Sequence, residues 1–252
     1  MINRKTPAQL DLMAAAGQVH ARCMKLLASK IRPGVTTAEL DEAAEKFIRS
    51  QGGIPTFKGF RGFPGSICAS PNSMVVHGIP GPYELKMGDI ISIDIGVTLD
   101  GWVADAACTF PVGPIDEETQ RMLDVTKESL ELGANKMVPG NRVGDIGNAV
   151  QTHVEAAGFS IIRTLVGHGI GENMHEDPQI PNYGTPGKGA LIEEGMVFAI
   201  EPMVNVGGPG VYADESDGWS VYSDDGSMAA HFEFTVAATT DGPRILTPWD
   251  KL

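Results

Sequence analysis

The feature that most constrains the fold of this chain is an internal duplication with an offset of 106 to 107 residues. The pattern of each half predicts two helices separated by a Pro-Gly pair. These helices cover about 6–30 and 36–52 around Pro33-Gly34, and about 117–136 and 143–158 around Pro139-Gly140. Further on, GDIISID (88–94) aligns with GMVFAIE (195–201). We therefore expect one catalytic domain over 1–252 with an α/β (α+β) fold, built from two helix–helix–β halves (about 1–113 and 114–252) with antiparallel sheets.

The first β-rich segment carries two aspartates in an otherwise apolar run. Asp100-Gly101 predicts a two-residue hairpin turn, and opposed residue numbers then sum to 201. Side chains alternate across a strand, so Asp94 and Asp105 share one face as diagonal neighbours, roughly 7–8 Å apart. Two carboxylates directed at one place repel unless they share a proton or a cation. A metal site and a merely solvated face are both compatible with the hairpin alone.

The duplication brings two more carboxylates to this face. Glu201 occupies in the second half the place that Asp94 holds in the first. Glu233 follows in AHFEFTVAA, where a strand would put His231 and Glu233 on one face. If the two halves pack about a pseudo-twofold axis, Asp94, Asp105, Glu201 and Glu233 converge. Their repulsion makes such an arrangement untenable without multivalent cations.

Histidines complete the set of candidate ligands. In VGHGIGENMHEDP (166–178), His168 and His175 are too far apart for one helical turn, so one can ligate metal while the other reaches substrate. His77, in VVHGIPG, precedes the first aspartate strand. A lone histidine is more commonly a surface or core residue. Four carboxylates and one imidazole suit two ions of Mn(II), Fe(II) or Co(II), and Zn(II) also fits.

Composition excludes several classes of partner. The net charge is −13 and no basic cluster stands out, which argues against specific nucleic acid or anionic membrane binding. We expect no secretory leader and no membrane span, because no run approaches 18 apolar residues. Three widely spaced cysteines fit neither a disulfide framework nor a zinc finger, so a reducing cytoplasm is expected.

Taken together, HGIPG, ISIDIGVTLDGWVAD, GHGIGENMHE, AIEPM and HFEFT resemble the type I methionine aminopeptidases over nearly the whole chain. That family has the pita-bread fold, a duplicated α/β unit around a dinuclear metal centre. The resemblance implies that Asp105 and Glu233 bridge the two ions. The full set of metal ligands that it implies is Asp94, Asp105, His168, Glu201 and Glu233.

The resemblance also implies roles around the substrate. His175 would lie near the scissile carbonyl, His77 near the amide of the second residue, and Glu201 would pass a proton to the leaving amine. An apolar slot for the methionine side chain would be lined by Phe57, Phe60, Phe63, Cys68, Met174 and Trp219. Two positions depart from many members of the family, because His231 stands in place of Gln and Phe234 in place of His.

The implied function is metal-dependent removal of the initiator methionine from nascent proteins and peptides with a small second residue. We expect a cytoplasmic monomer with transient ribosome association. One alternative is a prolidase or proline aminopeptidase that cleaves X-Pro bonds on the same fold. The other is a non-catalytic pita-bread protein that binds peptides or proteins.

Overall fold

The computed structural model describes residues 2–251 of the chain. Its helices are α1 (Pro7–Ala28), α2 (Thr37–Ser50), η1 (Phe60–Gly62), α3 (Glu117–Ala134), α4 (Val143–Ala156) and η2 (Trp249–Lys251). Its strands are β1 (Ile54–Pro55), β2 (Cys68–Pro71), β3 (Met74–Val76), β4 (Ile90–Leu99), β5 (Trp102–Pro111), β6 (Ser160–Ile161), β7 (Gly167–Gly169), β8 (Glu176–Ile180), β9 (Val197–Ile200), β10 (Met203–Asn205), β11 (Val211–Ala213), β12 (Val221–Ser223), β13 (Ala229–His231), β14 (Phe234–Thr239) and β15 (Gly242–Ile245). The four α-helices lie where the duplicated pattern predicts them.

Local capping explains where the helices begin. Before α2, the Thr36 hydroxyl accepts from the Glu39 backbone N–H at 3.2 Å, and the Glu39 carboxylate accepts from the Thr36 N–H at 2.8 Å. This reciprocal capping box satisfies two donors that the first helical turn leaves free. At α3, the Asp116 carboxylate accepts from the Thr119 N–H at 2.8 Å. The helix starts are therefore encoded locally in the sequence.

The predicted hairpin is confirmed in its turn and its register. Asp100 and Gly101 both have positive φ, 49° and 82°, as a type I′ turn requires. Every pair from Ile90–Pro111 to Leu99–Trp102 sums to 201. The Cys68 end of β2 then pairs with Asp94 on the other side of β4. The first of the predicted metal ligands thus sits in the middle of a fixed, fully paired strand.

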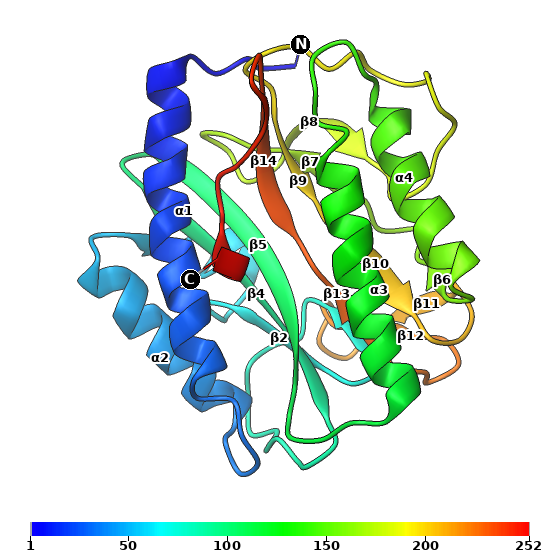
Figure 1. Ribbon diagram of the computed structural model, residues 1–252. Helices are drawn as coiled ribbons and strands as arrows, with labels where there is room; N and C mark the ends of the chain where they lie inside the picture. The colour runs from blue at the N-terminus through cyan, green and yellow to red at the C-terminus, as the bar shows by residue number, and fades with distance from the viewer. Residues whose placement is uncertain (1, 252) are drawn as a thin grey trace.

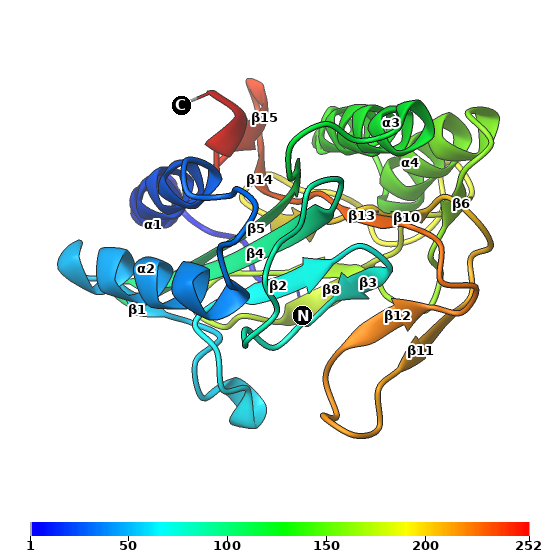
Figure 2. The ribbon, with the colours of Figure 1, turned by 90° about the horizontal axis from the view of Figure 1, so that it is seen from below.

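The helices and strands form layers (Figures 1 and 2). The pair α1 and α2 covers the β4–β5 hairpin, and the pair α3 and α4 covers the strands of the second half on the same side. The largest apolar cluster fills the space between, with fully buried Leu40, Ile93, Leu130 and Phe234 contributed by both halves. Each strand pair in the described region is antiparallel, including the five-stranded order β15-β14-β9-β7-β8.

A seam of hydrogen bonds joins the two halves between β5 and β14. The Asp105 N–H donates to the Thr235 hydroxyl at 3.1 Å, and that hydroxyl donates to the Asp105 carbonyl at 2.7 Å. Next to it, the Glu233 N–H donates to the Ala107 carbonyl at 2.9 Å. One carboxylate from each half is therefore fixed at the seam by backbone contacts of its own residue.

One local expectation needs correction. The run AHFEFTVAA is not a single strand, since β13 ends at His231 and β14 begins at Phe234. The chain leaves regular pairing between them because the Phe232 N–H donates to the Pro202 carbonyl and the Glu233 N–H to the Ala107 carbonyl.

None of the helices described for residues 2–251 has the length and hydrophobicity of a membrane span.

Candidate metal centre and substrate pocket

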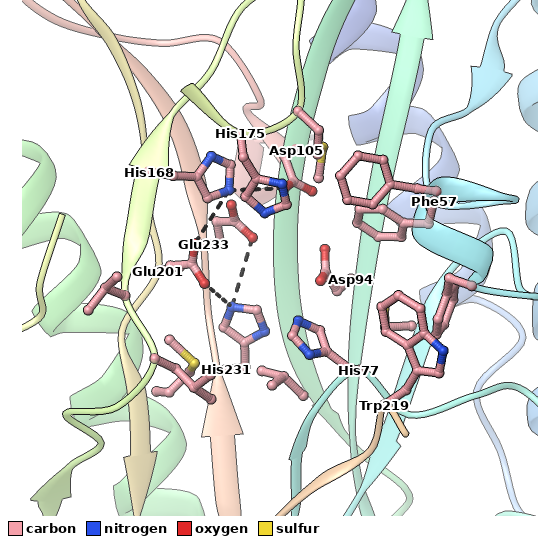
Figure 3. A pocket seen from close by; sticks show the side chains of 18 of the residues that line it. Phe57, His77, Asp94, Asp105, His168, His175, Glu201, Trp219, His231 and Glu233 are labelled. Atoms are coloured by element: carbon pink, nitrogen blue, oxygen red, sulfur yellow. Dashed lines mark ion pairs between the residues drawn. The ribbon is translucent and has the colours of Figure 1, made fainter. Parts of the chain in front are cut away.

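The structure brings every site residue expected from the sequence to the lining of one pocket (Figure 3). The expected members are Phe57, Phe60, Phe63, Cys68, His77, Asp94, Asp105, His168, Met174, His175, Glu201, Trp219 and Glu233. The pocket lies between the β4–β5 hairpin of the first half and the β7, β9 and β14 strands of the second (Figure 3). The packing of the two halves is what creates it.

The four carboxylates come from four backbone segments. Asp94 lies on β4 and Asp105 on β5, while Glu201 directly follows β9 and Glu233 directly precedes β14. Asp94, Asp105 and Glu233 are 9%, 3% and 1% exposed. The Asn182 amide donates to the Glu201 carbonyl at 2.9 Å, which fixes the chain where β9 ends. Four acidic groups therefore share one buried space.

His168 presents one ring nitrogen to these carboxylates. Its Nδ1–H donates to the Gly169 carbonyl at 2.8 Å, so the neutral ring carries its lone pair on Nε2. Burial lowers the pKa of His168 to about 4, which keeps the ring neutral at physiological pH. Nε2 lies 3.8 Å from Asp105 Oδ2 and 3.7 Å from Glu201 Oε1. This is the tautomer and orientation of a metal-ligating histidine.

Electrostatics make the carboxylate cluster unfavourable as it stands. Burial raises the pKa of Asp94 to about 7. Burial, and then the neighbouring carboxylates, raise the pKa values of Asp105, Glu201 and Glu233 well above the usual range. Concentrating four acidic groups in a buried space costs several kcal/mol unless something positive compensates them. A divalent cation supplies that compensation.

The donor atoms fit such a cation. Asp94 Oδ1, Asp105 Oδ1 and Glu233 Oε1 are buried without a hydrogen-bond partner among the described residues. One ligand atom each from Asp105, His168 and Glu233 lie within 4.8 Å of one another. Carboxylate oxygens with imidazole nitrogen form the donor set of Mn, Fe, Co and Zn sites. The residues present therefore suit divalent metal ions.

Three further imidazoles border the pocket (Figure 3). The His175 ring lies 4.3 Å from that of His168 and 5.5 Å from that of Phe60, measured between centroids. Burial, and then the neighbouring Arg61 cation, lower the pKa of His175, and burial and His175 lower that of His77. His77 has a positive φ of 61°, a conformation that is rare outside glycine and enriched at functional sites.

The wall beside Asp94 is apolar. Phe57, Phe63 and Met174 are 7%, 3% and 6% exposed and pack in one cluster with Cys68. Trp219, on the loop between β11 and β12, meets Phe63 edge to face at 5.1 Å. Asp217 holds that loop, because its carboxylate accepts from the Trp219 N–H at 2.7 Å and from the Ser220 hydroxyl. An apolar slot thus adjoins the carboxylate cluster.

Some lining residues were not predicted from the sequence. They are Arg61, Val76, Leu165, Val166 and Met203. His231 also lines the pocket, and the sequence places it on one face with Glu233 but leaves its role open. Arg61 gave a weaker signal, as the one basic residue in GFRGFPG. The aliphatic residues carry no chemical signature, and only the packing of the two halves brings them to the pocket.

Comparison with known proteins agrees with this geometry. The model of metallopeptidase family M24 matches residues 11–240. The methionine aminopeptidase of Clostridium perfringens is 51% identical over 247 residues, 98% of this chain and 99% of that protein. The crystal structure of methionine aminopeptidase from Rickettsia prowazekii has a TM-score of 0.97 at 40% identity and covers 98% of this chain and 100% of that one.

A more distant likeness concerns the fold alone. The Xaa-Pro dipeptidase from Bacillus anthracis has a TM-score of 0.77 at 20% identity, over 97% of this chain and 62% of that one. The family match, the identity over nearly the full length and the close superposition all point the same way. The chain therefore has the pita-bread fold and belongs to metallopeptidase family M24, in which it groups with the methionine aminopeptidases.

Proposed function

We propose that this protein removes the N-terminal methionine from nascent proteins and peptides whose second residue is small, with divalent metal ions as cofactors. The observation that carries the proposal is the convergence of Asp94, Asp105, His168, Glu201 and Glu233 in one pocket beside an apolar slot. Relatives at 51% identity over nearly the whole chain are methionine aminopeptidases. Neither half alone has the full set of donors.

Those five residues would hold the metal. A divalent ion in such a set polarises the scissile carbonyl and makes water nucleophilic near neutral pH. The protein contributes the fixed geometry, because Asp105 and Glu233 are anchored by the seam bonds to Thr235 and Ala107. His168 is oriented by its bond to the Gly169 carbonyl. Rigid ligands hold the reacting groups in place without reorganisation during the reaction.

His175 is placed to stabilise negative charge that develops on the carbonyl oxygen. It lies at the pocket mouth against His168, and its lowered pKa keeps it neutral, with one N–H donor. The next residue, Glu176, forms a buried ion pair with Lys5 at 2.8 Å. This pair anchors the segment that carries His175. His77, on the opposite wall, is positioned to contact the amide of the second residue.

Glu201 is suited to carry a proton towards the leaving amine. Its side chain is 14% exposed, compared with 5% for Asp105 and 2% for Glu233, so it is the more accessible of these three carboxylates. A carboxylate in reach of substrate can accept a proton from the attacking water and pass it to the departing nitrogen.

The apolar slot accounts for methionine as the first residue. An unbranched thioether reaches into a narrow pocket of Phe57, Phe63 and Met174 and gains sulfur–aromatic contacts. Burial raises the pKa of the Cys68 thiol well above its usual range, so Cys68 contributes a neutral, apolar surface. We expect side chains branched at Cβ to fit such a narrow slot poorly.

The test is release of methionine from Met-Ala-Ser by chelator-treated protein, before and after Mn(II), Fe(II) or Co(II) is added. We expect release with metal only. Nα-acetyl-Met-Ala-Ser is the matched substrate control, since an aminopeptidase needs the free amine. His153→Ala is the matched protein control, because His153 lies on the surface beside Glu128. No methionine release with any of these metals would contradict the proposal.

The two alternatives are less well supported. The X-Pro peptidase shares the fold at only 20% identity and would release alanine from Ala-Pro in the same assay. A non-catalytic binding protein would not need a complete set of ligand-type residues. That alternative would be favoured if the purified protein retained no transition metal and gained no activity when metal was added.

Several finer expectations remain proposals. Two ions, drawn from Co, Mn, Fe or Zn, are consistent with the number of carboxylates. A cytoplasmic site of action is consistent with Cys23, Cys68 and Cys108, which are buried free thiols in the described structure. A monomer with transient ribosome contact is the state expected for work on nascent chains. Metal analysis, light scattering and ribosome co-sedimentation measure these properties directly.

A further inference from the structure

His231 is a buried imidazole at the metal centre whose hydrogen-bonding capacity is unused. The residue is 2% exposed and is the last of β13. Neither of its ring nitrogens has a hydrogen-bond partner among residues 2–251. A buried polar group left unpaired costs about 1–3 kcal/mol. His20, which is also buried, bonds at least one ring nitrogen, to the Ala106 carbonyl at 2.9 Å.

The ring of His231 is directed at the carboxylates. Its Nε2 lies 3.8 Å from Glu201 Oε2 and 3.8 Å from Glu233 Oε2 (Figure 3). Those separations are too long for hydrogen bonds. They match the 3.7–3.8 Å that separates His168 Nε2 from Asp105 and Glu201. The two imidazoles therefore stand in the same relation to the acidic cluster.

This spacing is that of donors around a common ion. Two atoms each about 2.1 Å from a metal are roughly 3.4 Å apart at a tetrahedral angle and at most about 4.2 Å apart when opposite. Glu201 lies between the two rings, with Oε1 facing His168 and Oε2 facing His231. Each oxygen of the Glu201 carboxylate therefore faces one imidazole ring.

We infer that His231 is a further metal ligand, which binds through Nε2 together with Glu201 and Glu233. The inference rests on the metal centre of the proposed function and adds a second imidazole to it. Imidazole favours Fe(II), Co(II) and Zn(II) over Mn(II) more strongly than oxygen donors do. A centre with two imidazoles should therefore prefer these ions over Mn(II). That preference should be weaker in a variant that lacks the His231 imidazole.

The first experiment is a Co(II) titration of metal-free wild type and His231→Gln, followed by calorimetry and by visible absorption. Glutamine keeps a polar side chain of similar reach but is a poor ligand. We expect loss of a binding event, or weakening by at least about 100-fold, because loss of a mere partner of a ligand costs 10–100-fold. The absorption bands of Co(II) should also change. His153→Gln, which removes a surface histidine, is the matched control.

The second experiment needs no variant for its main readout. Wild type carrying ¹⁵N-labelled histidine is titrated with Zn(II), and imidazole nitrogens that bind metal shift in the NMR spectrum. We expect two rings to shift in this way, His168 and His231. A shift of one ring only, or a His231→Gln variant with unchanged Co(II) stoichiometry, affinity and absorption, would overturn the inference.

The outcomes separate this inference from the proposed function. If wild type releases methionine but only one imidazole binds metal, the ligand role of His231 is refuted and the proposed activity is supported. If both imidazoles bind metal but no methionine is released, the ligand role is supported and the proposed activity is refuted. In a competition between Mn(II) and Co(II), His231→Gln should favour Mn(II) more than wild type does, and equal preferences count against the inference.

Discussion

Replacing Asp94 by asparagine should stabilise the metal-free protein at neutral pH and at the same time abolish its stabilisation by metal. Asp94 is 9% exposed within β4, and its Oδ1 has no partner in the described structure. Burial raises the pKa of this carboxyl from 3.8 to about 7. The folded, metal-free protein therefore binds a proton at Asp94 that the unfolded chain has already released.

The sign and size of the effect follow from that difference. Because the folded pKa of Asp94 is above the unfolded value, the stability linked to this group is highest below about pH 4 and declines until about pH 7. The whole difference corresponds to about 4 kcal/mol, and the part between pH 5 and pH 8 to roughly 2–3 kcal/mol. Asparagine does not titrate, so the variant escapes this decline.

The assay compares four conditions for each protein. Thermal unfolding is measured at pH 5 and pH 8, with chelator and with saturating Mn(II) or Co(II). Without metal, the Tm of Asp94→Asn minus the Tm of wild type should increase by roughly 5–10 °C between pH 5 and pH 8. The buried histidines titrate in both proteins, so their contributions to the Tm difference largely cancel. Metal at 100 times its Kd should add about 2.7 kcal/mol to wild type only, which offsets more than half of the advantage of Asp94→Asn at pH 8.

Two results would refute this reasoning. A metal-free Tm difference that is the same at both pH values would show that Asp94 does not take up a proton on folding. Equal stabilisation of both proteins by metal would show that Asp94 is not a ligand.

Other perturbations test the remaining parts of the site. Asp105→Ala should abolish metal binding itself, and a variant that retains metal at full affinity by metal analysis would contradict the proposal that Asp105 is a ligand. His175→Ala should keep the wild-type metal content and lower kcat by roughly 100–1000-fold, and unchanged turnover would remove His175 from the mechanism. Lys5→Met leaves the Glu176 carboxylate buried without its partner and should cost about 3–5 kcal/mol in urea unfolding, whereas a loss below 1 kcal/mol would mean that water reaches this pair.

Features set by local chemistry were predictable from the sequence. Thr36 with Glu39 specifies the start of α2, and Asp100-Gly101 specifies both the hairpin turn and its register. Once the register is set, the common face of Asp94 and Asp105 follows from strand alternation alone. Asp94 is therefore identifiable as a candidate ligand without any tertiary contact.

Features set by the contact between the halves were less predictable. The break between β13 and β14 depends on the bond from Glu233 to Ala107, more than 100 residues away. Aliphatic lining residues such as Leu165 and Met203 reach the pocket only through this packing. The role of His231 stays open in the sequence, because a single histidine beside Glu233 has no signature that distinguishes a metal ligand from a neighbour of one. Its unpaired nitrogens are visible only in three dimensions.

The seam between β5 and β14 has a consequence for how the molecule could be divided. Asp94 and Asp105 precede the Gly113-Pro114 junction, whereas His168, Glu201 and Glu233 follow it. If the chain were cut there, each fragment would expose only part of the proposed ligand set, and the other fragment would supply the rest. The covalent junction supplies a high effective concentration of one half for the other. The two fragments would still associate through the apolar cluster that both halves share, and metal would strengthen that association by binding ligands from both fragments.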